Sequence, residues 1–333
     1  MDPIAPAPRP LSVVAAAQQA IEIARVRLFP LRIERWLALG VVAMLDQCGR
    51  GSAGGNVGFP GGGPGGTGSP GSSSGSARAA DELSQAWGWI HEHLAILIAA
   101  AVAVLALVIA LIAIVTFLRS RGVFMYIDDV ATGRADIVRP WHEHRDKAWS
   151  FFAWSFGTSL VGLALALVLA VPLVMLIVSM IRSGASCAPV GGVVAIILLF
   201  IAMGLTLALF GVFLRDFVAP IQMALGVPCG PAIRVAWGLV KGNPLTFLGY
   251  LGLKLVFAIA AGILALVAGC FTCCIGFLPV IRQTLLQPVY YFERAWSMLL
   301  LRQAGYDLFP PGAFTPPAPP PLAPPPPLPP PQA

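Results

Sequence analysis

The chain has 333 residues, of which 57% are hydrophobic and 11% are charged, with a formal net charge of +6. Soluble globular domains carry about 25% charged residues, so this composition excludes an ordinary soluble enzyme. It predicts an all-α integral membrane protein, a helical bundle of five to six membrane segments with an N-terminal interfacial helix. The basic residues are spread among short loops, which favours membrane lipids over nucleic acid as their partner.

Residues 1–48 are predicted to form an N-terminal interfacial helix and a short membrane segment. The helix is expected to end at Pro30, and its apolar face consists of Val14, Ala17, Ile21, Ala24 and Leu28. A helix packed on the cytoplasmic end of the bundle would show the same pattern. The second part, residues 31–47, is too short for an upright span.

Four later runs are long enough to cross the roughly 30 Å hydrocarbon core of a bilayer: residues 94–118, 156–181, 190–214 and 245–269. A fifth run, residues 275–301, has the length but contains Arg282, Gln283, Gln287, Glu293 and Arg294. All five lie in a predicted multi-pass domain, residues 81–309. A Gly/Ser-rich flexible loop (49–80) precedes this domain, and a Pro-rich disordered tail (310–333) follows it.

Loop charges predict the orientation. The segments between the first and second long runs and between the third and fourth are basic, so the positive-inside rule places both in the cytoplasm, with the C-terminus. The first run would then begin outside, although residues 9–35 carry five arginines that also favour the cytoplasm. Residues 31–47 are therefore expected to cross as a tilted or thinned segment; an external amino terminus or an interfacial segment are the alternatives.

Polar residues inside the apolar runs form a candidate intramembrane site. Lys254 and Glu293 lie at similar depth, about 15 Å from the cytoplasmic ends of their runs, so they can pair. On the fifth run one helical face carries Gln283, Gln287, Tyr290 and Arg294. Such a face forms hydrogen bonds between helices or lines a solute path, and both remain open.

Three other motifs suggest familiar chemistry. Gly49, Gly51 and Gly54 have dinucleotide-binding spacing, but the preceding strand, the following helix and the acidic residue about 20 positions on that such a site requires are not evident, so we expect no cofactor. Each of the two His-Glu-His motifs, residues 91–93 and 142–144, places its histidines about 200° apart on a helix, so we expect no metal site. Thiols at the outer face could form one disulfide, Cys187 with Cys270, Cys273 or Cys274. A metal half-site or plain packing are the alternatives for these cysteines.

The first basic loop also holds a compact charged group, which we expect to form a cytoplasmic loop surface: Asp128, Asp129, Arg134, Asp136 and Arg139. An ordinary solvated topology signal would look the same. No nucleophile–base pair lies at a plausible depth, so we do not expect an enzyme. The leading hypothesis is a non-enzymatic membrane protein that binds lipid or scaffolds a protein partner or a second copy. A transporter or channel using the polar face of the last run is the alternative.

Several short motifs are spread along most of the chain, from about residue 10 to 309. They are Leu28-Phe29-Pro30 with Arg35-Trp36, Ser120-Arg121-Gly122 with the segment 124–129, Arg139-Pro140-Trp141, the segment 216–221, Asn243-Pro244, Cys273-Cys274 and Gln287-Pro288-Val289 before Arg294-Ala295. In these motifs the chain resembles a family of uncharacterised bacterial multi-pass membrane proteins. Some members carry the label of a glycerophosphoryl diester phosphodiesterase membrane domain. The resemblance implies a membrane topology, with a bacterial inner membrane as the expected location, and no particular activity.

Overall fold

The computed structural model describes residues 11–29, 31–48, 88–89, 92–183, 188–271 and 279–310. Within these ranges the chain is helical: α1 (Val13–Leu28), α2 (Ile33–Gln47), α4 (Leu94–Thr132), α5 (Val138–Glu143), α6 (Arg145–Ser183), α7 (Ala188–Phe213), the π-helix η1 (Leu214–Val218), α8 (Ala219–Leu225), α9 (Cys229–Gly242), α10 (Pro244–Phe271), α11 (Pro279–Leu285) and α12 (Gln287–Gln303). The predicted all-α class is confirmed for these residues. The predicted loop at 49–80 and the tail beyond residue 310 lie outside them.

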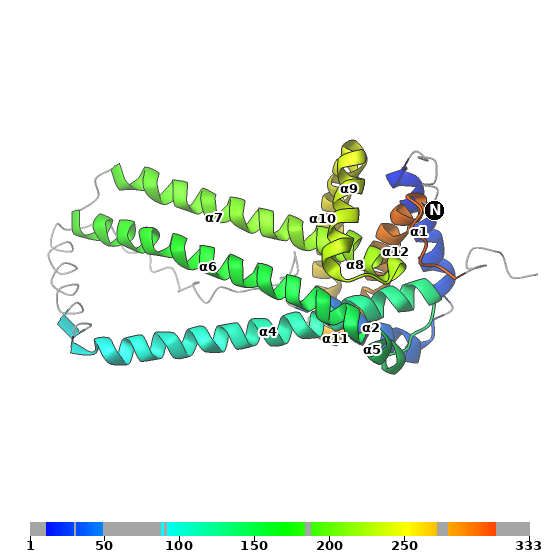
Figure 1. Ribbon diagram of the computed structural model, residues 1–333, viewed down its shortest axis with the longest axis horizontal. Coiled ribbons are helices and arrows are strands. Elements are labelled where there is room, and N and C mark those ends of the chain that lie inside the picture. Colours follow the sequence, from blue (N-terminus) through cyan, green and yellow to red (C-terminus); the bar gives the residue numbers. More distant parts are fainter. Residues whose placement is uncertain are drawn as a thin grey trace, which may run out of the picture.

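Three long helices, α4, α6 and α7, run side by side away from a cluster of shorter helices (Figure 1). We call this cluster the base; it comprises α1, α2, α5, α8, α9, α11 and α12 with the adjoining ends of the long helices. The most apolar 18 residues of α4 and of the α7 stretch include no buried residue, and those of α6 are 6% buried. Because water-exposed apolar surface of this extent is unfavourable, these helices need a non-aqueous environment.

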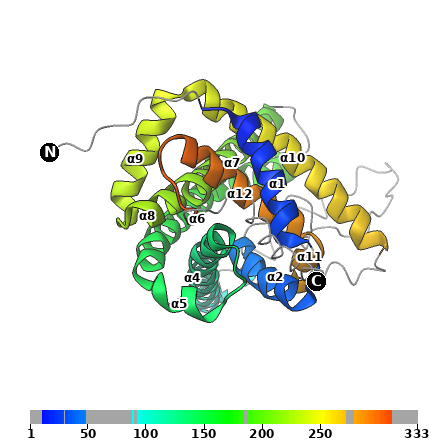
Figure 2. The same cartoon turned by 90° about the vertical axis from the view of Figure 1, so that its right-hand side faces the viewer.

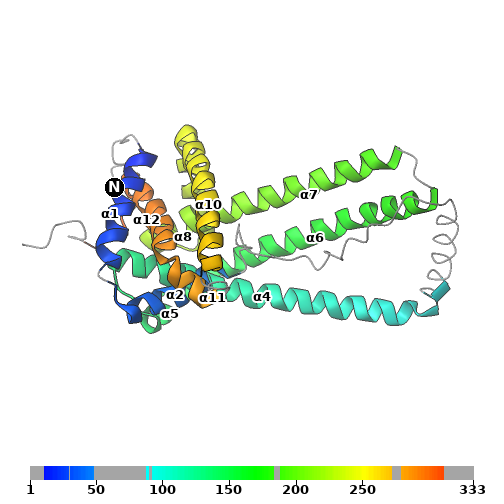
Figure 3. The same cartoon turned by 180° about the vertical axis from the view of Figure 1, so that it is seen from behind.

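Four helical stretches in the described part of the chain are long and apolar enough to cross a membrane: Leu94–Thr132, Arg145–Ser179, Gly191–Leu225 and Pro244–Ala268. The fourth, in α10, lies across the direction of the other three and beside the base (Figures 1 and 3). Four such helices support a multi-pass membrane protein. Among the described residues, this number is smaller than the five to six spans predicted from the sequence.

The predicted fifth run is divided into two short helices. Helix α11 ends at Leu285, and α12 begins at Gln287 with Pro288 in its first turn. Proline has no backbone N–H, so it cannot continue the hydrogen-bonding of α11 but fits the first turn of a new helix, where that N–H would have no partner. Much of α12 is buried, and it packs against α1 (Figure 2). It is therefore part of the base.

Helix α1 packs on α12. This contact agrees with the alternative given above, a helix that packs on the bundle, rather than with a helix in the membrane interface. Its Ser12 cap accepts a hydrogen bond from the Ala15 amide at 3.2 Å. The buried face consists of Ala16, Ala20, Ile23, Ala24 and Leu28. The predicted face was wrong in part, because Val14 and Ile21 are each 58% exposed. Small alanines repeat every four residues on the buried side, and this ridge lets the two helices approach closely.

Helix α2 lies within the base, against the end of α4 and against α11 (Figure 2). The close approach to α4 depends on Gly122, since a Cβ atom there would lie 2.6 Å from Leu45 Cβ and 2.5 Å from the Leu45 carbonyl carbon. Residues 31–47 therefore pack against the buried end of the long helix α4, and their crossing of a membrane stays a prediction. Their apolar side chains are used for packing at one end of α4.

Aromatic rings fill the centre of the base. Trp296 contacts Tyr250 at 4.7 Å and Phe292 at 5.6 Å between ring centroids, and its indole N–H donates to the Val13 carbonyl at 3.0 Å. Tryptophan is enriched at the membrane interface. Trp296 is 2% exposed and belongs to the core instead.

The close contact at Gly122 gives a stability prediction. Gly122→Ala forces α2 away from α4 and is expected to lower the free energy of unfolding by about 1–3 kcal/mol, the usual cost of overpacking. Thermal unfolding of the detergent-solubilised protein measures the change. Gly157→Ala on α6 is the matched control, since a Cβ there meets no atom within 4 Å. Equal melting of the two variants would contradict the prediction.

Candidate functional site

The candidate site begins at the π-helix η1, where consecutive residues Arg215 and Asp216 both point into the base. Pro220 lacks an N–H, so the Asp216 carbonyl would lose its usual partner in a regular α-helix. The chain widens instead, and the Ala219 amide donates to the Leu214 carbonyl five residues earlier. All five residues of η1 are buried. Single π-turns of this kind often occur at functional sites.

Six charged side chains from four elements meet at this point and form what we call the central ionic cluster. Its members are Asp46 on α2, Arg215 and Asp216 on η1, Lys254 on α10, and Glu293 and Arg294 on α12. Three are acidic and three are basic, so the formal charges balance. Residues 248 positions apart in the sequence are thereby brought into direct contact.

Arg215 lies at the centre of the cluster. Its Nε lies 3.1 Å from Asp46 Oδ2, its Nη1 lies 3.0 Å from Glu293 Oε1, and Nη2 also contacts Asp46. Arg294 Nη2 in turn donates a hydrogen bond to Asp46 Oδ1 at 2.6 Å. Neither Arg215 nor Asp46 has any exposed side-chain surface. A guanidinium buried in this way is tolerated because carboxylates surround it.

Lys254 joins α10 to the cluster. Its Nζ contacts Asp216 and lies 2.8 Å from Glu293 Oε1. The Tyr250 hydroxyl, one turn earlier on α10, donates to Asp216 Oδ2 at 3.0 Å. Glu293 is the least buried of the three carboxylates, with 14% of its side chain exposed. This side of the cluster is therefore nearest to solvent or lipid.

Hydrogen bonds to neighbouring groups fix Arg294, the remaining basic member of the central ionic cluster. Arg294 Nη1 donates to the Arg215 carbonyl at 2.9 Å. Burial lowers the pKa of the Arg294 guanidinium, while Asp46 opposes that shift. Arginine has so high an ordinary pKa that the group stays charged. Nearby, Gln287 Nε2 donates to the Tyr126 hydroxyl at 3.0 Å, which links α12 to α4.

The structure brings together some of the predicted polar residues and separates others. Lys254 and Glu293 form the pair that their depths allowed. Gln287 and Arg294 are buried on α12, and burial raises the pKa of the half-buried Tyr290. Gln283 belongs to α11, so the break at Leu286 separates it from the face predicted for a single helix.

Half of the cluster was missed by the sequence reasoning. Asp46 ends a short apolar segment, and a charge there could have indicated a buried partner. Arg215 was counted among the basic residues between the third and fourth runs, and Asp216 entered only as the first residue of the motif 216–221. The sequence does contain a signal for these two residues: Arg215 and Asp216 are adjacent, and Pro220 follows Asp216 by four positions.

The predicted cytoplasmic loop surface is mostly an internal network. Arg139 contacts Asp128 and lies 3.5 Å from Asp136 Oδ2, while Asp129 Oδ1 accepts the Asp136 amide at 3.1 Å. Asp128 and Asp129 are buried, so the prediction of a surface was wrong for both. Arg134 alone of the five is fully on the exposed side. The network closes the turn between α4 and α5.

The predicted disulfide cannot be followed in the structure. Cys187, Cys273 and Cys274 lie outside the described residues. Cys270, at the end of α10, is an exposed free thiol. On α9, burial raises the pKa of the Cys229 thiol to about 12, which keeps it protonated and unreactive near neutral pH.

The central cluster predicts a large effect for Asp46→Asn. The amide keeps the shape of the side chain but leaves Arg215 and Arg294 short of one negative charge, which is expected to cost about 3–5 kcal/mol of stability. Thermal unfolding in detergent measures it, with Glu34→Gln on the exposed side of α2 as the control. Adding Arg294→Gln to Asp46→Asn should recover part of the loss. A stability equal to that of Glu34→Gln would contradict this role.

Comparison with known proteins places the chain in a family. It matches a family of unknown function, DUF7544, over residues 11–304. No curated protein and no solved structure matches it. The family description names no activity, and it gives no support to a bacterial origin or to the phosphodiesterase label. The matched range includes every member of the central ionic cluster, and the chain belongs to the DUF7544 family of unknown function.

Proposed function

We propose that this protein is a non-enzymatic multi-pass membrane protein that binds lipid along α4, α6 and α7, held in position by the base. The observation that carries the proposal is the separation of two surfaces. The long helices expose almost their entire apolar length, while the buried charges are gathered at one end. A protein of this shape offers lipid a large apolar contact area along helices that are anchored at the base.

The central ionic cluster supports a structural role for the polar residues. Its three cations each contact at least one carboxylate, and Tyr250 and Arg294 add further hydrogen bonds. Charges that satisfy one another in this way join helices and leave little affinity for a passing ion. A structural role of the cluster is therefore favoured over a path for a solute.

The distribution of basic residues supports a cytoplasmic base. Basic side chains on α1, α2, α9 and the turn between α4 and α6 all occur at the base end of the long helices (Figure 1). The positive-inside rule would place this end, with the end of α12, in the cytoplasm. The inner membrane of a bacterium is the location proposed.

The first test is to extract the protein with its surrounding native lipid and to identify what accompanies it by mass spectrometry. Lipid binding predicts a retained shell enriched in one lipid class, because fixed helices select lipids that fit between them. A stoichiometric protein or a second copy would shift the proposal to scaffolding of that partner. A well-folded protein that keeps no lipid would contradict lipid binding.

A transporter or channel is the second candidate, favoured by the partial exposure of Glu293 beside Lys254. Lys254→Met tests it. If the pair is structural, the variant should lose about 3 kcal/mol of stability, since two carboxylates remain buried without this counter-charge. Protein yield and thermal unfolding measure the loss, with the exposed Lys241→Met as control. A variant that folds normally but abolishes a measurable solute flux would establish the transport hypothesis instead.

A further inference from the structure

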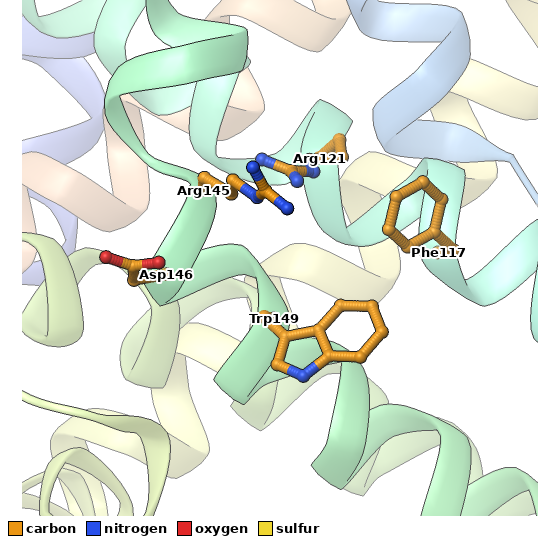
Figure 4. A pocket seen from close by; sticks show the side chains of 5 residues that line it. All are labelled: Phe117, Arg121, Arg145, Asp146 and Trp149. Atoms are coloured by element: carbon orange, nitrogen blue, oxygen red, sulfur yellow. The ribbon is translucent and has the colours of Figure 1, made fainter.

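A cavity of about 520 Å³ lies between α4 and α6, outside the central ionic cluster. It is lined by Phe117 and Arg121 of α4 and by Arg145, Asp146 and Trp149 of α6 (Figure 4). The cavity lies just beyond the end of the apolar part of α4, since Arg121 follows Phe117 by about one helical turn. If α4 crosses a bilayer, this is the level of the lipid headgroups.

Two positive charges face each other in this cavity. The guanidinium groups of Arg121 and Arg145 point toward one another, and the Asp146 carboxylate is directed away from them (Figure 4). Among the residues described, neither arginine has a carboxylate within 4.0 Å. Two like charges held together repel each other unless an anion lies between them.

Arg121 is held in place for such a role. It is 8% exposed, and its Nη1 donates to the Trp141 carbonyl at 3.0 Å. Its guanidinium also lies over the rings of Phe117 and Trp141, at 5.5 and 5.3 Å from their centroids. One hydrogen bond leaves further N–H donors of the five in a guanidinium for an anion. Arg145, by contrast, is exposed.

Aromatic rings lead from the cavity along the apolar part of the helices. Trp149 is 6.1 Å from Phe117 and 5.2 Å from Phe152, and Phe152 stacks on Phe156 at 5.4 Å. Trp149 is 59% exposed. A cavity with charge at one end and rings at the other matches an amphipathic ligand.

We propose that this cavity binds the phosphate group of an anionic membrane lipid, with Arg121 and Arg145 on the phosphate oxygens and the aromatic rings against the start of the acyl chains. The assignment rests on the proposed function, because α4 and α6 must stand in a bilayer for a lipid to reach it. It adds the class of lipid and the place of binding. Aromatic side chains form two of the five lining residues, which favours a lipid phosphate over a free one.

The test compares lipid binding to the purified full-length protein in detergent by native mass spectrometry. Phosphatidylglycerol and phosphatidylcholine with identical acyl chains are titrated separately. Arg145→Gln is expected to weaken phosphatidylglycerol binding about tenfold, the effect of losing one charge-assisted hydrogen bond, and to weaken phosphatidylcholine binding less, because the choline cation already offsets the charge of that phosphate. Arg145 is exposed, so the variant should melt at the same temperature as the unaltered protein.

Arg134→Gln is the matched control, since it removes the same charge from an exposed position at the same end of α4, outside the cavity. Equal weakening by the two variants would overturn the site and indicate attraction by overall charge. Competition by excess inorganic phosphate, with equally tight binding of phosphate alone, would overturn the lipid assignment. A native lipid shell without preference for phosphatidylglycerol would overturn this site while leaving the proposed function intact. Absence of any bound lipid would overturn both.

Discussion

Burial of Arg215 is the constraint on which the rest of the base depends. A guanidinium without solvent contact requires negative partners, and the chain provides them from helices that are far apart in sequence. Asp46 brings α2 to the site, and Glu293 brings α12. Lys254 then brings α10, because two of the carboxylates need a further cation. The π-turn before Pro220 allows this arrangement by turning two adjacent charges inward.

This anchoring at one end explains the shape of the whole molecule. Helices α4, α6 and α7 pack against the base and leave their apolar lengths exposed, while α10 lies across them (Figures 1 and 3). Charged groups fix helices strongly where they meet, whereas apolar surfaces facing lipid gain little from contact with one another. The long helices are therefore anchored at the base, and α6 and α7 also touch along their apolar length, where Gly162 faces Leu207.

Arginine is used in two different ways in and near the base. Arg215 is surrounded by carboxylates and has no exposed surface, so it joins helices. Arg121 and Arg145 face each other across a cavity without a carboxylate between them (Figure 4). The first environment is complete within the protein, whereas the second calls for an anion from outside. Among the described residues, the carboxylate of Asp146 lines this cavity but forms no ion pair with either arginine, whereas the carboxylates around Arg215 contact it directly.

Composition and apolar length by themselves determined the all-α class, the multi-pass character and the positions of the long helices, because a span needs a continuous apolar run that can be read directly. The similar depths of Lys254 and Glu293 also predicted their contact. Tertiary structure decided the rest. A proline and its neighbours divided the fifth run at Leu286, and packing against α12 determined which face of α1 is buried. The partners of Asp46 lie 169 and 248 positions away. Periodicity describes one helix at a time, so the meeting of distant charges becomes visible only when the helices are placed in space.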